Sequence, residues 1–194
     1  MSALAFALCL PCCAGGHAAT NGSGALSGDV HDVAGGAARG PEAELACVST
    51  APERCFDARD NNCNGIIDEG CGVETGAVQF VIAWDAARAD VDLQVIDPAG
   101  ELVEVGRPVA SGLVKSRDCP GRNNECRGRN FENVYLEAAT APRGRYLVRV
   151  VLEQLGGEPP PVRVDFGARV GPRTYGREVL LSRVDVPFEA EFSL

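Results

Sequence analysis

The stretch VDLQVID (residues 91–97) alternates apolar and polar side chains. In an extended strand Val91, Leu93 and Val95 point to one side, and the polar residues between them point to the other. This two-residue period is typical of a sheet with one buried face and one wet face. The stretch therefore predicts antiparallel β-structure.

Runs of similar composition lie on both sides of this stretch. They are rich in Val, Ile, Leu, Phe and Tyr, and Gly, Pro and Asn clusters separate them. These runs are residues 77–84, 133–138, 145–153, 162–170, 177–184 and 188–194. A helical 3.6-residue period is weak throughout. We therefore expect a mainly β fold, an antiparallel β-sandwich of about seven to eight strands over residues 75–194.

The amino-terminal part of the chain has a different composition. Residues 1–18 combine a short apolar run with small residues, as in a cleaved signal peptide. Because no good lipobox precedes Cys12 or Cys13, lipoprotein anchoring is the less favoured prediction. Residues 19–46, rich in Gly, Ala and Ser, predict a disordered, flexible linker. No later run is long enough to be a transmembrane segment, so we expect a secreted or cell-envelope protein.

Nine cysteines fall into three groups. Removal of a leader with its three cysteines leaves six, an even number that suits an oxidising compartment. The pair Cys119 and Cys126 predicts a short disulfide-closed loop. The other four predict two disulfides in a small module at residues 47–72, with the pairing left open. They are Cys47, Cys55, Cys63 and Cys71.

Within this module, DARDNNCNGIIDEGC (residues 57–71) has the spacing of a calcium loop. Alternate residues of a tightly curled loop converge on one point and offer hard oxygen atoms. The predicted ligands are the side chains of Asp60, Asn62, Asn64 and Asp68 and the carbonyl of Ile66. The twelfth position is Cys71, so Glu69 or Asp57 would have to complete the shell. The alternative is a disulfide-stapled knuckle whose polar residues only make turns.

The longer stretch ERCFDARDNNCNGIIDEGC (residues 53–71) resembles the MopE-type metal-binding repeat of secreted bacterial proteins. More distantly, it is similar to the thrombospondin type 3 calcium repeat. Asn62 and Asn64 stand where the MopE-type pattern has Asp. The resemblance implies metal binding, and the family's name is tied to copper. Because the module lacks His, Met and Trp, we expect Ca²⁺ as the cofactor and disfavour copper.

Charge is unevenly distributed along the chain. The net charge is −9, and residues 41–72 hold seven acids against two bases. Concentrated negative charge attracts a divalent cation and repels phosphates. We therefore expect no nucleic-acid partner.

Residues 77–155 resemble the YfaP-like domain of secreted bacterial proteins. The resemblance rests on IAWDAARADVDLQVIDPAGE (residues 82–101) and RNFENVYLEAATAPRGRYLVRVV (residues 129–151), with Phe131 in place of a proline. It implies a β-sandwich adhesion or accessory domain. The partner would be a surface polysaccharide or an envelope protein.

Three acids of the sandwich, Asp90, Asp92 and Glu132, offer a possible second metal site. The alternative, which we favour, is a solvated strand end. Asp90 and Asp92, beside Trp84, could contact sugar hydroxyls, and a hydrolase that uses Asp90, Asp92 and Glu132 is a third possibility.

Enzyme signatures are otherwise missing from the sequence. The two histidines, His17 and His31, lie in the leader and the linker, so a His-based triad or zinc hydrolase is excluded. The sequence thus predicts an exported, non-enzymatic calcium-binding protein with a β-sandwich interaction domain. The alternative function is a carbohydrate-binding accessory module of a secreted hydrolase system.

Overall fold

The computed structural model describes residues 51–107, 109–120, 126 and 128–194. The predicted signal peptide, the predicted linker and Cys47 lie outside the described residues. Eight strands form the described fold. They are β1 (Val78–Trp84), β2 (Asp90–Ile96), β3 (Val114–Arg117), β4 (Phe131–Leu136), β5 (Arg145–Gln154), β6 (Val162–Val170), β7 (Arg173–Leu181) and β8 (Phe188–Ser193).

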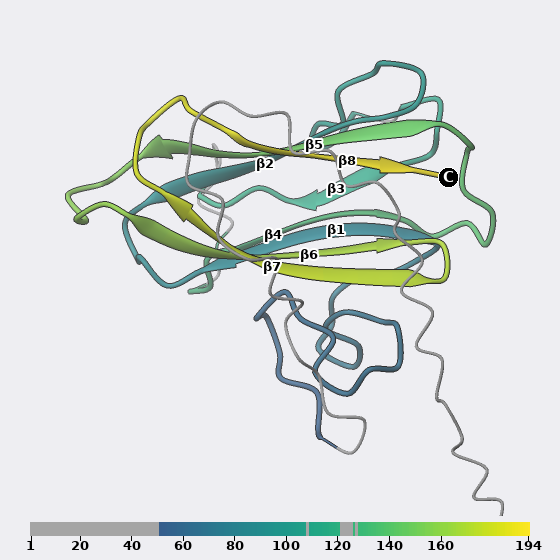
Figure 1. Ribbon diagram of the computed structural model, residues 1–194, viewed down its shortest axis with the longest axis horizontal. Helices are drawn as coiled ribbons and strands as arrows, with labels where there is room; N and C mark the ends of the chain where they lie inside the picture. Colours follow the sequence, from purple (N-terminus) through teal and green to yellow (C-terminus); the bar gives the residue numbers. More distant parts are fainter. Residues whose placement is uncertain (1–50, 108, 121–125, 127) are drawn as a thin grey trace, which may run out of the picture.

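The strands form two antiparallel sheets that stack face to face. The larger sheet has the order β3-β4-β1-β6-β7 and the smaller one the order β2-β5-β8. Figure 1 shows the two layers, with residues 51–72 gathered on the outer side of the larger sheet. We call residues 51–72 the loop module. The predicted antiparallel β-sandwich is confirmed.

Strand β1 is buried on both faces, which explains its unbroken apolar sequence. All seven of its residues are buried. Phe80 and Ile82 belong to the core between the sheets, whereas Val81 and Ala83 belong to a second apolar cluster. Because neighbouring residues of a strand point to opposite faces, the second cluster must lie on the outer face of the larger sheet, where the loop module packs.

A buried carboxylate joins the two sheets of the sandwich at the edge strand β2. Strand β2 is an edge strand of the smaller sheet, and an edge strand exposes unpaired N–H groups. Glu132 of β4 accepts a hydrogen bond of 2.7 Å from the Leu93 N–H of β2. It therefore links the two sheets.

Most strands lie within a few residues of their predicted positions, and two differences are informative. Strand β3 was not predicted, because its sequence VKSR lacks the apolar alternation that marks the other strands. The predicted strand at residues 177–184 starts later than the corresponding strand β7, which begins at Arg173. The sequence GPRTYG hides this beginning, since Pro and Gly there signal a turn.

Within the described part of the chain, no helix is long and apolar enough to cross a bilayer.

Candidate metal centre

The loop module is fixed to the sandwich by close backbone packing. Ala58 and Ile67 are fully buried in one cluster with Val81, Ala83 and Phe131. A Cβ atom added at Gly167 of β6 would lie 2.3 Å from the Ala58 carbonyl oxygen. Because no side chain fits there, this glycine lets the module lie directly on the sheet.

Polar and aromatic contacts extend this attachment. The Arg59 guanidinium lies 2.6 Å from Asp165 of β6. The ring of Phe56 meets that of Phe131 edge to face at 5.4 Å, and the Arg129 guanidinium lies 3.8 Å from the centre of the Phe56 ring. The loop module is therefore attached to the sandwich by an ion pair, a ring contact and a cation–π contact in addition to the apolar cluster.

Disulfides staple the module as predicted. Cys55 and Cys71 are bonded, which resolves one of the pairings that the sequence left open. Cys63 is also disulfide-bonded. In the sandwich Cys119 and Cys126 form the predicted short bridge. None of the described cysteines of the module is a free thiol.

The Asp60 side chain shapes the curled loop at residues 60–69, which we call the metal loop. Its carboxylate accepts hydrogen bonds from the N–H groups of Asn64 at 3.1 Å and Gly65 at 2.9 Å. Gly65 has a φ of 85°, a left-handed conformation that glycine adopts without strain. The Ile66 N–H donates to Asn64 Oδ1 at 2.9 Å. These bonds fold the predicted ligands around one short curve.

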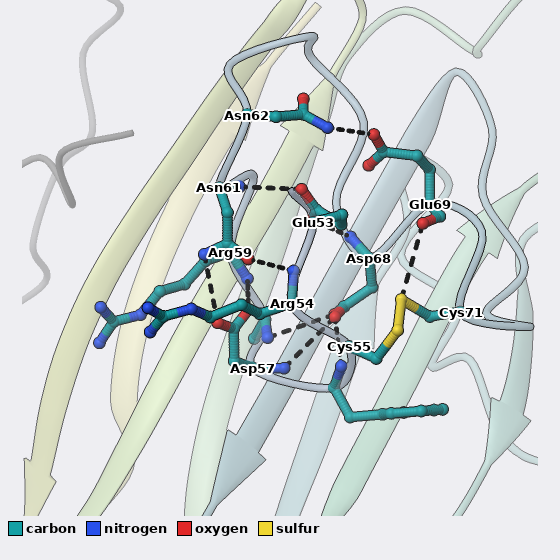
Figure 2. Close-up of a disulfide and its surroundings, with 12 residues drawn as sticks. Glu53, Arg54, Cys55, Asp57, Arg59, Asn61, Asn62, Asp68, Glu69 and Cys71 are labelled. Carbon is teal, nitrogen blue, oxygen red and sulfur yellow. Dashed lines mark hydrogen bonds between the residues drawn. A yellow bond between two sulfur atoms is a disulfide. The ribbon is translucent and has the colours of Figure 1, made fainter. Parts of the chain in front are cut away.

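Glu69 closes this curve from the other end. Its Oε1 accepts hydrogen bonds of 2.5 Å from the amide nitrogens of both Asn62 and Asn64. The second oxygen, Oε2, is buried and has no hydrogen-bond partner among the described residues. Figure 2 shows Glu69 reaching toward Asn62, whereas Asp68 points the opposite way. An unpaired, buried carboxylate oxygen normally costs free energy, so this oxygen is available to a ligand.

Asp68 has a different role from the predicted one of direct ligand. Its carboxylate accepts the N–H groups of Phe56, Asp57 at 3.3 Å and Ala58 at 3.2 Å. Burial raises the pKa of Asp68 to about 7. The side chain thus holds the turn at residues 56–58 rather than facing the metal loop.

Asp57 is likewise engaged away from the metal loop. Its carboxylate accepts the Arg59 N–H at 3.1 Å and the Asn61 side-chain amide at 3.2 Å, and burial raises its pKa. Of the two residues offered to complete the shell, the structure brings Glu69, and not Asp57, to Asn62 and Asn64.

Sequence reasoning missed Glu53. One of its oxygens accepts the Asp68 N–H at 3.0 Å, and the other accepts the Asn61 N–H at 3.1 Å. The carboxylate therefore ties together the two ends of the metal loop (Figure 2). Glu53 lies before Cys55, outside the spacing of the predicted ligands. Only the tertiary contacts therefore show its role in the loop.

Of the three acids offered as a second metal site, the structure groups Asp92 and Glu132 but not Asp90. Asp92, Asp118 and Glu132 bring carboxylate oxygens within 4.8 Å of one another; Asp118 takes the place that the prediction gave to Asp90. Asp90 lies beside this group, and burial, followed by repulsion from Asp92, raises its pKa to about 6.

The group already contains a cation. Lys115 lies 2.9 Å from Glu132 and 3.3 Å from Asp118. Burial is the largest single influence and lowers the pKa of Lys115, but the combined attraction of Glu132, Asp118 and Asp92 raises the pKa overall. Glu132 also accepts the Cys119 N–H at 2.9 Å. We call Asp92, Asp118, Glu132 and Lys115 the acidic cluster; its lysine supplies the positive charge that an ion would otherwise bring.

Trp84, offered as a sugar-contacting ring, belongs to the core between the sheets. It is 6% exposed, and its indole N–H donates to the Ala89 carbonyl at 3.0 Å. A ring buried in this way has no free face on which a sugar could stack.

Comparison with known families supports a metal site in the module. Residues 46–69 match the Cu-binding MopE family, which is described as a "Putative metal-binding motif". The match ends at Glu69 and covers none of residues 77–155, so the resemblance to a YfaP-like domain is not supported. No curated protein matches the chain, and no solved structure does.

The family match corrects the prediction of Ca²⁺. The matched family is named for copper, the metal that the sequence reasoning disfavoured. The metal loop offers carboxylate and amide oxygens, and Cu²⁺ accepts oxygen donors in tetragonal sites. The unpaired Glu69 Oε2 fits such an ion. Asp60, Asn62, Asn64 and Glu69 are the residues that would hold it.

Proposed function

We propose that this protein is an exported, non-enzymatic metal-binding protein that holds a divalent ion, Cu²⁺ in the first instance, in its metal loop. The observation that carries the proposal is the buried, unpaired Oε2 of Glu69, within the segment that matches the metal-binding motif.

The hydrogen bonds of the metal loop support this proposal. The amide groups of Asn62 and Asn64 now turn N–H donors toward Glu69. Each amide oxygen accepts one backbone N–H, from Asn64 and from Ile66, and keeps a second lone pair that an ion could use. Two carboxylates, Asp60 and Glu69, would then balance the charge of a divalent ion, and the two amide oxygens would complete four donors.

The proposed setting is the cell exterior or envelope. Disulfides such as Cys55–Cys71 and Cys119–Cys126 form and persist in oxidising compartments. The sandwich would serve as the interaction domain and dock a surface polysaccharide or an envelope protein. The buried Trp84 speaks against sugar stacking, so within this proposal a protein partner is preferred.

Titration calorimetry of the oxidised full chain with Cu²⁺ tests the metal site. We expect one tight site in the wild type and at least a tenfold weaker one in Glu69→Gln, which keeps the size of the side chain but removes its charge. The matched control is Glu137→Gln, an exposed acid remote from the metal loop in sequence, which should bind as the wild type does. Equal Cu²⁺ binding by the wild type and Glu69→Gln would overturn the proposed site.

The choice of ion has its own test in the same assay. For a site of oxygen and nitrogen donors, affinity rises from Mn²⁺ to Cu²⁺ and falls again at Zn²⁺. We expect the loop to follow this order. Tighter binding of Mn²⁺ than of Cu²⁺ would contradict copper as the ion.

A further inference from the structure

The loop module contains no soft ligand in its described state. Residues 51–72 include no His and no Met. Cys55 and Cys71 are bonded to each other, and Cys63 is in a disulfide as well. A disulfide sulfur is not a thiolate, and the thiolate is the form of cysteine that binds metals.

All the donors that the structure gathers at the metal loop are therefore hard oxygens. Asp60 and Glu69 contribute carboxylates, and Asn62 and Asn64 contribute the amide oxygens that accept backbone N–H groups. Soft thiolate and thioether ligands select Cu⁺, whereas oxygen donors suit divalent ions. The two carboxylates also attract a doubly charged ion about twice as strongly as a singly charged one at the same distance.

We propose that the oxidised metal loop discriminates between the two oxidation states of copper: it retains Cu²⁺ and does not retain Cu⁺. This inference rests on the proposed function and adds the oxidation state of the bound ion. The disulfides take part in the selection, because they withdraw from the module the thiolates that would hold Cu⁺.

Opening the disulfides should reverse the preference. Reduction of Cys55–Cys71 would free two thiols whose Cα atoms lie 5.3 Å apart in the folded module. As thiolates they would offer Cu⁺ a pair of soft ligands. The loop module therefore offers oxygen donors to a hard ion in oxidising conditions and cysteine thiolates to a soft ion in reducing conditions.

The experiment loads the oxidised full chain with Cu²⁺ and counts copper that co-elutes on gel filtration, before and after anaerobic ascorbate. Ascorbate supplies one electron to each Cu²⁺ and gives Cu⁺, and a thiol assay confirms that the disulfides stay intact. The Glu69→Gln variant measures copper held elsewhere on the chain, and this background is subtracted. In a parallel sample a phosphine opens the disulfides before copper is added as Cu⁺.

We expect the loop's copper to fall by at least tenfold after ascorbate and to be retained in the phosphine-treated sample. Copper that stays bound after ascorbate with intact disulfides would overturn the inference and leave the proposed function standing. Failure of the phosphine-treated sample to retain Cu⁺ would overturn the role given to the cysteines. No loop-bound Cu²⁺ before ascorbate would overturn the proposed function, and the inference with it.

Discussion

The metal loop and the acidic cluster both gather carboxylates, yet they differ in what those carboxylates contact. In the acidic cluster, Lys115 lies between Glu132 and Asp118, and N–H groups fill the remaining positions of Glu132. In the metal loop, the Glu69 carboxylate accepts from two amide groups and, among the residues that the structure describes, has no partner for its second oxygen.

This difference shows that the number of acids does not mark a metal site. A carboxylate that already has a cation and N–H donors gains little from an ion, because its charge is compensated. A buried carboxylate oxygen without a partner gains a great deal. The partners of each acid, rather than the number of acids, distinguish a structural cluster from a candidate metal site.

Removing the cation from the acidic cluster should give the largest effect. Lys115→Met would leave the fully buried Glu132 without its counter-ion, and breaking a buried pair in this way costs about 3–5 kcal/mol. Chemical denaturation of the oxidised protein would measure the loss. The double variant Lys115→Met with Glu132→Gln should recover part of it, since no buried charge remains.

A loss below about 1 kcal/mol in Lys115→Met would contradict this view of the cluster. It would mean that Glu132 is held neutral and needs no lysine. Metal titration of the same variants sharpens the comparison, because neither should change copper binding at the metal loop.

Separating the loop module from the sheet should give an intermediate effect. In Gly167→Ala the new Cβ would lie 2.3 Å from the Ala58 carbonyl oxygen, so the module must shift. Overpacking of this kind costs about 1–3 kcal/mol. Trypsin should then cut faster after Arg59, which pairs with Asp165 in the wild type.

The matched control is Arg163→Ala on the same strand, since Arg163 is half exposed and makes only surface ion pairs. It should leave the cleavage rate after Arg59 unchanged. An unchanged rate in Gly167→Ala would show that the module does not depend on this close approach.

A further expected effect concerns pH and Asp68. Burial raises the pKa of Asp68 to about 7 in the folded protein, against about 4 in an unfolded chain. The folded state therefore holds this proton more tightly, so its stabilising contribution is complete below pH 4 and is lost as the pH rises through 7.

The measurement is the free energy of unfolding of the wild type and of Asp68→Asn between pH 5 and pH 8. The wild type should lose stability relative to the variant as the pH rises. Parallel curves would show that the Asp68 carboxyl titrates at the same pH in the folded and unfolded states.

The sequence alone predicted the β-sandwich and the curled loop at residues 60–69. Apolar and polar residues alternate in runs such as residues 91–97 and 145–153. This two-residue period indicates a strand with one buried face, and it can be read from neighbouring residues alone. The spacing from Asp60 to Glu69 records a curled loop, which is also local. Strand β3 escaped prediction because its side chains are mostly polar and its pairing with β4 is a long-range property.

Only the tertiary structure decided which acids are free to bind. Asp68 fits the ligand spacing, but its carboxylate lies at the turn of residues 56–58 instead of facing the metal loop. Glu69, one position further, faces Asn62 and Asn64. Likewise Asp118 and Lys115 reach Glu132 only because β3 pairs with β4. Sequence spacing determines where an acidic residue lies along the chain. Competition between N–H donors, cations and solvent in the folded protein determines which partner its carboxylate contacts.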